Sequence, residues 1–104
     1  MKRAIIWSRD ALDDLKQQIA HIAADDPAAA RRVIDKITTV AADLGHFATG
    51  RPGRVLGTYE KSIVGLPFVI AYSLAADNGR ENVAILRVIH TSRNWLPDNW
   101  PERA

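Results

Sequence analysis

The sequence of 104 residues contains no cysteine, which excludes disulfide bonds, thiolate metal sites and cysteine nucleophiles. No run of apolar residues approaches the ~18 that a membrane span requires. The three histidines, His21, His46 and His90, lack the spacing of a metal site, and no glycine pattern fits a phosphate-binding loop. We therefore expect no metal or cofactor, no signal peptide or membrane anchor, and a cytoplasmic location.

The chain also has almost no excess of charge of either sign. The chain has 14 Lys and Arg residues against 12 Asp and Glu residues, and a net charge of +2 is too small to indicate nucleic-acid binding by itself. The excess lies in residues 50–104, which carry seven basic and five acidic side chains. Apolar residues make up 47% of the chain and charged residues 25%, as in ordinary globular proteins. We expect one folded domain over residues 1–104.

The first half predicts a short strand at residues 4–7 and then a helical hairpin over about residues 9–45. Ser8 is a favourable N-cap for a first helix over about 9–24, and Asp26-Pro27 is a favourable start for a second. Apolar residues recur at spacings of three and four and should line the inner faces of both helices. They are Leu12, Leu15, Ile19 and Ile22 in the first helix, and Ala30, Val33, Ile37, Val40 and Leu44 in the second.

The second half predicts a sheet over about residues 54–93. Glycine, proline and arginine at 50–54 indicate a loop, which should lead into a short strand at Arg54–Leu56. Residues 58–63 are largely polar, as is typical of an edge or outer strand.

Two longer apolar runs follow, at residues 68–75 and 83–90. Both are apolar on each face, which favours central positions in the sheet, and Asn78-Gly79 between them is typical of a hairpin turn. The order β-α-α-β-β-β-β therefore predicts an α+β domain, with the helical hairpin packed on a mostly antiparallel sheet and a C-terminal tail at 95–104.

Three cations near the start of the sheet form a candidate binding patch. Arg51 and Arg54 flank a Pro-Gly turn, and Lys61 lies on the polar strand, so all three can converge on one side of the sheet and contact phosphate. The alternative is a solvated edge strand, whose charges discourage pairing with other chains.

Arg87 interrupts an apolar strand and should point to the same face as Val83, Ile85 and Ile89. A charge in that position must be paired or must reach solvent at a functional surface. A structural ion pair is the favoured interpretation.

The end of the last strand gathers polar and aromatic groups. His90 is followed closely by Arg93 and Trp95, which places imidazole, guanidinium and indole groups at the sheet rim, where they can donate a proton, bind phosphate or stack on RNA. The alternative is that these residues close the end of the sheet by hydrogen bonding. Among the tryptophans, Trp7 is expected in the core, whereas Trp95 and Trp100 stay open between core and partner contact.

These residues resemble a known family. The element order, the strand at 68–72 behind a Gly-Leu-Pro turn, and the stretch from Ile85 to Asn94 are similar to toxins of the ParE/RelE superfamily, the small toxins of bacterial type II toxin–antitoxin pairs. The most specific part is the arginine, two apolar residues, histidine and later arginine that end the last strand. The resemblance covers residues 3–95 and implies the ParE/RelE toxin-like fold.

The resemblance implies one of two activities. RelE-like members are ribosome-dependent ribonucleases, in which basic side chains stabilise the phosphate while the 2′-hydroxyl of the messenger attacks it. ParE-like members have longer helices and are described as poisoning DNA gyrase without catalytic residues of their own. Nuclease members typically carry an arginine in the penultimate strand, where this sequence has Val69. This difference and the long helical hairpin favour the ParE-like branch.

The resemblance also implies partners and site residues. A cognate acidic antitoxin should bind the basic second half and give a heterodimer or a larger complex. We expect target contacts among Arg51, Arg54, Lys61, Arg93 and Trp95. Should the chain instead cut messenger RNA, the candidate catalytic residues are Arg54, Lys61, His90 and Arg93. A third hypothesis is a degenerate toxin that retains only antitoxin binding.

Overall fold

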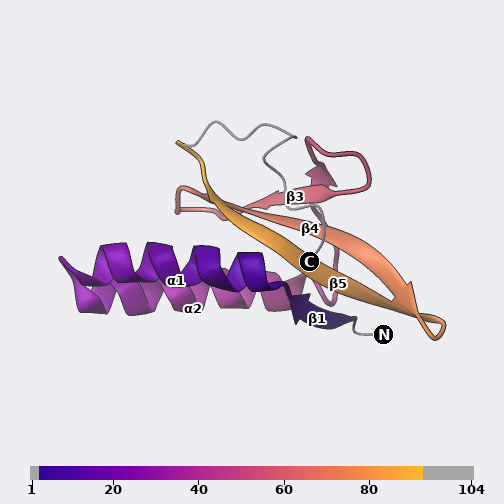
Figure 1. Cartoon of the computed structure of the whole chain (residues 1–104), viewed down its shortest axis with the longest axis horizontal. Coiled ribbons are helices and arrows are strands. Elements are labelled where there is room, and N and C mark those ends of the chain that lie inside the picture. The colour runs from indigo at the N-terminus through magenta and orange to yellow at the C-terminus, as the bar shows by residue number, and fades with distance from the viewer. Residues whose placement is uncertain (1–2, 93–104) are drawn as a thin grey trace.

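The structure is a computed structural model that describes residues 3–92. Its elements are β1 (Ala4–Trp7), α1 (Arg9–Ala23), α2 (Pro27–Asp43), β2 (Arg51–Pro52), β3 (Tyr59–Ser62), β4 (Phe68–Asp77) and β5 (Arg80–His90). The strands form one sheet in the order β1-β5-β4-β3-β2, in which only the β1–β5 pair is parallel. The two helices lie side by side along this sheet, and the turn that joins them extends beyond it (Figure 1). The predicted α+β architecture is confirmed.

Both helices begin where the sequence predicts. The Ser8 side chain accepts a hydrogen bond from the Ala11 amide at 3.0 Å, and Asp26 accepts one from the Ala29 amide at 3.0 Å. Each contact satisfies an amide that the first helical turn leaves without a partner. Ser8 also donates its hydroxyl to the Leu86 carbonyl at 3.0 Å, which ties the start of α1 to β5. Within residues 3–92, no helix is long and apolar enough to cross a membrane.

The core lies between the helical hairpin and the sheet. Its largest fully buried side chains are Tyr72, Ile37, Leu44, Ile70, Ile85 and Val83. Trp7 packs against this cluster, as predicted. The inner face of α2 is confirmed at Ala30, Ile37 and Leu44, which are buried.

The prediction that Leu12 lies on the inner face of α1 is wrong. Leu12 is 41% exposed, and Ala11 is fully buried in its place. The contacts that Ser8 and Asp14 make with β5 set the rotation of the helix about its axis, and alanine at position 11 permits close approach to the sheet. The spacing of apolar residues does not reveal how these contacts rotate the helix.

The predicted strand at Arg54–Leu56 is also wrong, because the strand lies earlier, at Arg51–Pro52. Residues 55–58 form a turn instead, in which the Thr58 amide donates to the Val55 carbonyl at 3.0 Å and Gly57 has a φ of 86°. A glycine with positive φ in the third position is typical of a type II turn. The other strand predictions are confirmed: β3 is polar and lies near the sheet edge, and β4 and β5 are central.

A β-bulge in β5 changes which residues face the helices. Tyr72 pairs with Ile85 and Ala71 pairs with Arg87, so Leu86 is an extra residue without a partner on β4. As a result, Val88 joins Val83 and Ile85 in the core cluster. The prediction that Ile89 shares the face of Val83 and Ile85 is therefore wrong, because strict alternation fails across a bulge.

The ion pair predicted for Arg87 is confirmed, and its partner is Asp14 of α1. Arg87 Nε donates to Asp14 Oδ2 at 2.7 Å and Nη2 donates to Oδ1 at 2.9 Å, while the Val88 amide donates to Oδ2 at 3.0 Å. The parallel pairing of β1 ends at Trp7 and Ile85, so the Val88 amide lies past the end of the neighbouring strand. The carboxylate of Asp14 occupies the position that a further strand residue would take.

Replacement of Asp14 by alanine should lower the free energy of unfolding by about 3 kcal/mol, because it leaves a largely buried guanidinium and a strand amide without their acceptor. Asp13→Ala is the matched control, since Asp13 is exposed on the same helix, and it should change stability by less than about 0.5 kcal/mol. Urea denaturation measures both variants. Equal losses would contradict the role assigned to Asp14.

Candidate functional site

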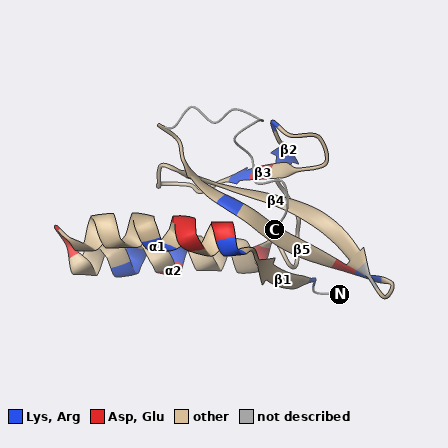
Figure 2. Cartoon of the chain, viewed as in Figure 1, with Lys and Arg blue, Asp and Glu red and all other residues tan. Residues whose placement is uncertain are grey.

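The basic hairpin, which we define as residues 51–62, carries the three candidate cations (Figure 2). Its start is fixed to the sheet by Tyr72, whose phenol oxygen accepts a hydrogen bond from the Gly50 amide at 2.8 Å. Tyr59 stacks on the same ring, with centroids 5.6 Å apart. Burial raises the pKa of Tyr72, and the bond from Gly50 opposes this rise. The hairpin therefore starts from a rigid base.

Arg54 is held by Glu60. Arg54 donates its backbone amide and its Nε to Glu60 Oε2, both at 2.9 Å, and its Nη2 donates to Oε1 at 3.2 Å. The Glu60 side chain is 7% exposed and that of Arg54 is 31% exposed. The hydrogen bond from Arg54 lowers the pKa of Glu60 against the opposing effect of burial, and the same bond raises the pKa of Arg54. The guanidinium is thus a structural partner of a buried carboxylate.

The three cations do not share one side of the sheet, contrary to the sequence prediction. Lys61 pairs with Ile70, a core residue that faces the helices, and its Nζ donates to Thr49 Oγ1 at 2.8 Å. Glu60 immediately precedes Lys61 on the strand and therefore points to the opposite face, where Arg51 pairs with it. Arg51 and the Glu60–Arg54 pair thus lie on the face away from the helices.

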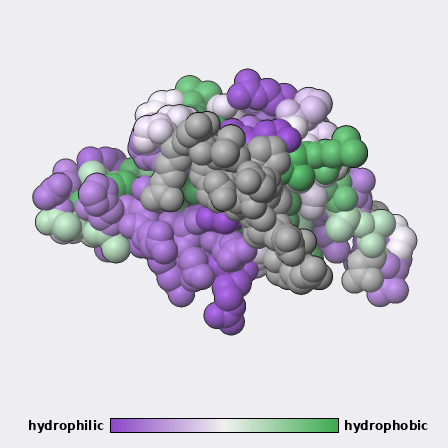
Figure 3. Space-filling model, turned by 45° about the horizontal axis from the view of Figure 1, so that its top comes forward, coloured by the Kyte–Doolittle hydropathy of each residue, from purple (hydrophilic) through white to green (hydrophobic). Residues whose placement is uncertain are grey.

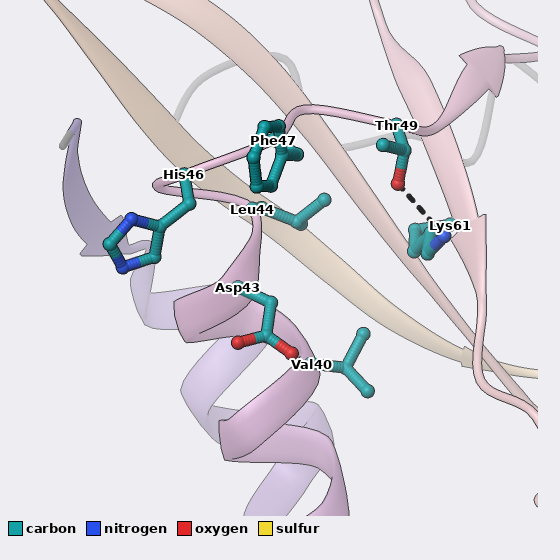
Figure 4. A pocket seen from close by; sticks show the side chains of 7 residues that line it. All are labelled: Val40, Asp43, Leu44, His46, Phe47, Thr49 and Lys61. Carbon is teal, nitrogen blue, oxygen red and sulfur yellow. Dashed lines mark hydrogen bonds between the residues drawn. The ribbon is translucent and has the colours of Figure 1, made fainter. Parts of the chain in front are cut away.

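A pocket of about 430 Å³ opens beside Lys61, between the end of α2 and β3 (Figure 4). Its lining residues are Val40, Asp43, Leu44, His46, Phe47, Thr49 and Lys61. We call it the α2–β3 pocket. Phe47 is 75% exposed, so the pocket presents an apolar surface next to a cation. Most of the surface in Figure 3 is hydrophilic, with hydrophobic side chains in small separate patches.

His90 lies on the helix-facing side of β5, with its ring edge-to-face against Phe68 at 5.2 Å. Its Nδ1 accepts the Ser92 amide at 3.1 Å and lies 2.7 Å from Ser92 Oγ. A neutral ring that accepts at Nδ1 carries its proton on Nε2. His90 and Ser92 line a polar cavity of about 410 Å³ with Gln17, Gln18 and His21 of α1. The predicted site residues Arg93 and Trp95 lie outside the described residues, as does Trp100.

Val69 occupies the position where the family resemblance implies an arginine in a nuclease. It is buried in β4, between Ser62 and Ile89. His90 lies on one face at the end of β5, whereas the Glu60–Arg54 pair lies on the other face of the sheet. The structure therefore brings Arg51 and Arg54 together and separates them from Lys61 and His90.

Two features of this region were missed in the sequence. The ion pair of Glu60 could not be predicted, because Glu60 is an ordinary acidic residue in a polar strand and its partner lies six residues earlier, across a turn. Phe47 has no distinct signal either, because a single apolar residue in a polar stretch can be buried or exposed.

Comparison with known proteins gives consistent matches. The family described as the ParE toxin of the type II toxin–antitoxin system parDE matches residues 5–95. The curated protein "Putative toxin Y4kP" of Sinorhizobium fredii is 37% identical over 95 residues, which are 90% of this chain and 94% of that protein.

Solved structures share the fold. The chromosomal ParDE system of P. aeruginosa contains a chain with 22% identity and a TM-score of 0.76, covering 86% of this chain and 96% of that one. The RelBE2 toxin–antitoxin complex of Mycobacterium tuberculosis gives 22% identity and a TM-score of 0.57, covering 86% and 99%. The YoeB/ParE toxin of Agrobacterium tumefaciens gives 12% identity and a TM-score of 0.56, covering 84% and 97%.

The Glu60–Arg54 pair should make stability depend on pH. Because the folded-state pKa of Glu60 is lowered, its contribution is complete above the unfolded pKa of about 4.3 and is lost as the pH falls below that value. Glu60→Gln should lower the free energy of unfolding by about 2 kcal/mol at pH 7 and should reduce the loss of stability below about pH 4.3.

Glu81→Gln is the matched control, because Glu81 is half exposed and forms a surface ion pair with Arg3. It should cost less than about 1 kcal/mol. Urea denaturation at several pH values measures both. A Glu60→Gln variant with the wild-type pH profile would contradict the assignment.

Proposed function

Since the chain belongs to the ParE toxin family of type II toxin–antitoxin systems, we propose that it arrests growth by binding DNA gyrase through its surface, without a catalytic site of its own. The observation that carries this proposal is the internal pairing and separation of its cations. A nuclease must place positive charge, an acid and a base around a single phosphate. Of the described cations that the resemblance would use, Arg54 is paired with Glu60, and Lys61 lies on the opposite face of the sheet.

Three positions support this view. The guanidinium of Arg54 neutralises Glu60, so it brings little net charge to a phosphate. Arg87 neutralises Asp14 at the junction of α1 and β5. Val69 is apolar and buried where nuclease members typically carry an arginine. Among residues 3–92, these three positions do not favour a phosphate clamp, and a toxin that acts by surface contact with a macromolecule needs none.

A ribosome-dependent ribonuclease is the second candidate, and the His90 cavity favours it. His90 lies beside amide, hydroxyl and imidazole groups of a polar cavity, and an imidazole in such a position can take part in acid–base catalysis. Lys61 lies on the same face of the sheet and supplies a cation. A test of the target must therefore include both reactions.

The α2–β3 pocket suits the antitoxin. It combines apolar side chains of α2 with the exposed ring of Phe47, and Lys61 lies at its edge (Figure 4). An acidic, amphipathic segment can bury its apolar side chains against Phe47 and place a carboxylate near Lys61. We propose that the cognate acidic antitoxin docks here, in a heterodimer or a larger complex, and neutralises the toxin in the cytoplasm.

Purified toxin in molar excess should block the supercoiling of relaxed plasmid by gyrase or should stabilise gyrase-cleaved DNA. The His90→Ala variant should inhibit within about twofold of wild type, because the proposal gives the imidazole no chemical role. The same preparations should leave messenger RNA uncut on translating ribosomes. Cleavage that disappears in His90→Ala, together with unaffected gyrase, would establish the ribonuclease instead.

Phe47→Ala and Lys61→Glu should each weaken binding of the antitoxin encoded beside this gene by about tenfold, because they remove apolar contact area and charge complementarity from the pocket. Lys36→Glu makes the same charge reversal at an exposed position on α2 and should change affinity by less than about twofold. Isothermal titration measures the dissociation constants. Unchanged affinity in both pocket variants would place the antitoxin elsewhere.

A further inference from the structure

Two turns of the same type lie on either side of β3. Residues 55–58 and residues 63–66 each close with a bond from the fourth amide to the first carbonyl, and each has a glycine with positive φ in the third position. The second position of each turn carries an exposed apolar residue. Leu56 is fully exposed, and Val64 is 85% exposed.

Polar side chains brace the first turn. Thr58 Oγ1 donates to the Val55 carbonyl at 2.6 Å, and Glu60 holds both the backbone and the guanidinium of Arg54. The Gly53 amide donates to the Thr58 carbonyl at 2.9 Å, and a Cβ at position 53 would lie 2.6 Å from Thr58 Oγ1. The second turn consists of Ile63, Val64, Gly65 and Leu66 and is held by apolar contacts instead, because Ile63 is buried and Leu66 packs against the core.

This bracing fixes the direction in which Leu56 projects. Both Thr58 and Glu60 are buried, so the hydrogen bonds that hold the turn are shielded from water. A side chain on an already ordered loop loses little conformational freedom when it enters a partner, and most of its apolar burial then contributes to affinity. The turn therefore displays a leucine that is preorganised for contact.

The charge around Leu56 is positive at the surface. The buried carboxylate of Glu60 is neutralised by Arg54, and Arg51 is an exposed cation on the same hairpin. Figure 2 shows these basic segments of β2 and the adjoining turn. A partner that receives Leu56 gains further attraction from acidic side chains around its pocket.

We propose that Leu56 is the anchor by which this chain binds its target protein, inserted into an apolar pocket of leucine size whose rim carries carboxylates. The inference rests on the proposed function, in which the toxin acts by surface contact with a protein. A convex, rigid projection requires a concave site on a folded partner. A flexible antitoxin segment offers no such pocket and matches the α2–β3 pocket instead.

Leu56→Ala and Leu56→Asp test the anchor, and Val64→Ala and Val64→Asp are matched controls on the equivalent turn. We expect Leu56→Ala to raise the toxin concentration needed for half-maximal gyrase inhibition by about tenfold, and Leu56→Asp to abolish both this inhibition and growth arrest on induction. The Val64 variants should stay within about twofold of wild type in both assays. All four should retain antitoxin affinity and should melt within about 2 °C of wild type, because both positions are exposed.

Arg51→Glu tests the acidic rim, with Lys36→Glu as its control. We expect about fivefold weaker gyrase inhibition from the first and no change from the second, with the difference shrinking at high salt.

The readouts separate this inference from the proposed function. If wild-type toxin arrests growth but spares gyrase, and Leu56→Asp loses the arrest, the gyrase proposal fails and the anchor stands. If Leu56→Asp arrests growth as strongly as wild type, the anchor is overturned whatever the target. If Leu56→Asp loses antitoxin affinity but stays toxic, the antitoxin occupies this site and the inference is wrong. A wild-type chain without any effect on growth would overturn both.

Discussion

The carboxylate of Asp14 joins the helical hairpin to the sheet, and the arrangement of the molecule depends on it. It binds the guanidinium of Arg87 and the amide of Val88 at the position where β1 no longer pairs with β5. This contact sets the rotation of α1, which buries Ala11 and exposes Leu12. It also fixes β5 just after the bulge at Leu86, so that Val88 enters the core. The side chain of Asp14 thus links α1 to β5 next to the β-bulge.

Local signals in the sequence predicted much of the fold. Ser8 and Asp26 mark both helix starts because capping is a contact between near neighbours in the chain. Asn78-Gly79 marks the central hairpin for the same reason, with φ values of 54° and 78°. Arg87 was predicted to be in an ion pair because burial of a lone charge is costly, although its partner lies 73 residues away and could not be identified.

Several of the errors share a physical cause, since they depend on long-range geometry. A bulge shifts the alternation of a strand without leaving a mark in composition, so the face of Ile89 was wrong. The cations of the basic hairpin look like one patch in sequence, but the pleat places Lys61 and Glu60 on opposite faces. The sequence therefore allowed us to name candidate site residues, but it did not show on which face of the sheet each one lies. The division of the candidate site between two faces separates Arg51 and Arg54 from Lys61 and His90.

The parallel pairing of β1 with β5 joins the first strand to the last, with Ala4 opposite Asn82 and Trp7 opposite Ile85. During synthesis, the edge strand has no partner until nearly the whole described chain has left the ribosomal exit tunnel. Such pairing gives the protein a high contact order and delays completion of the sheet. A prematurely terminated translation product that ends before β5 cannot form the native sheet. The topology thus restricts the native fold, and any function that needs it, to chains that include β5.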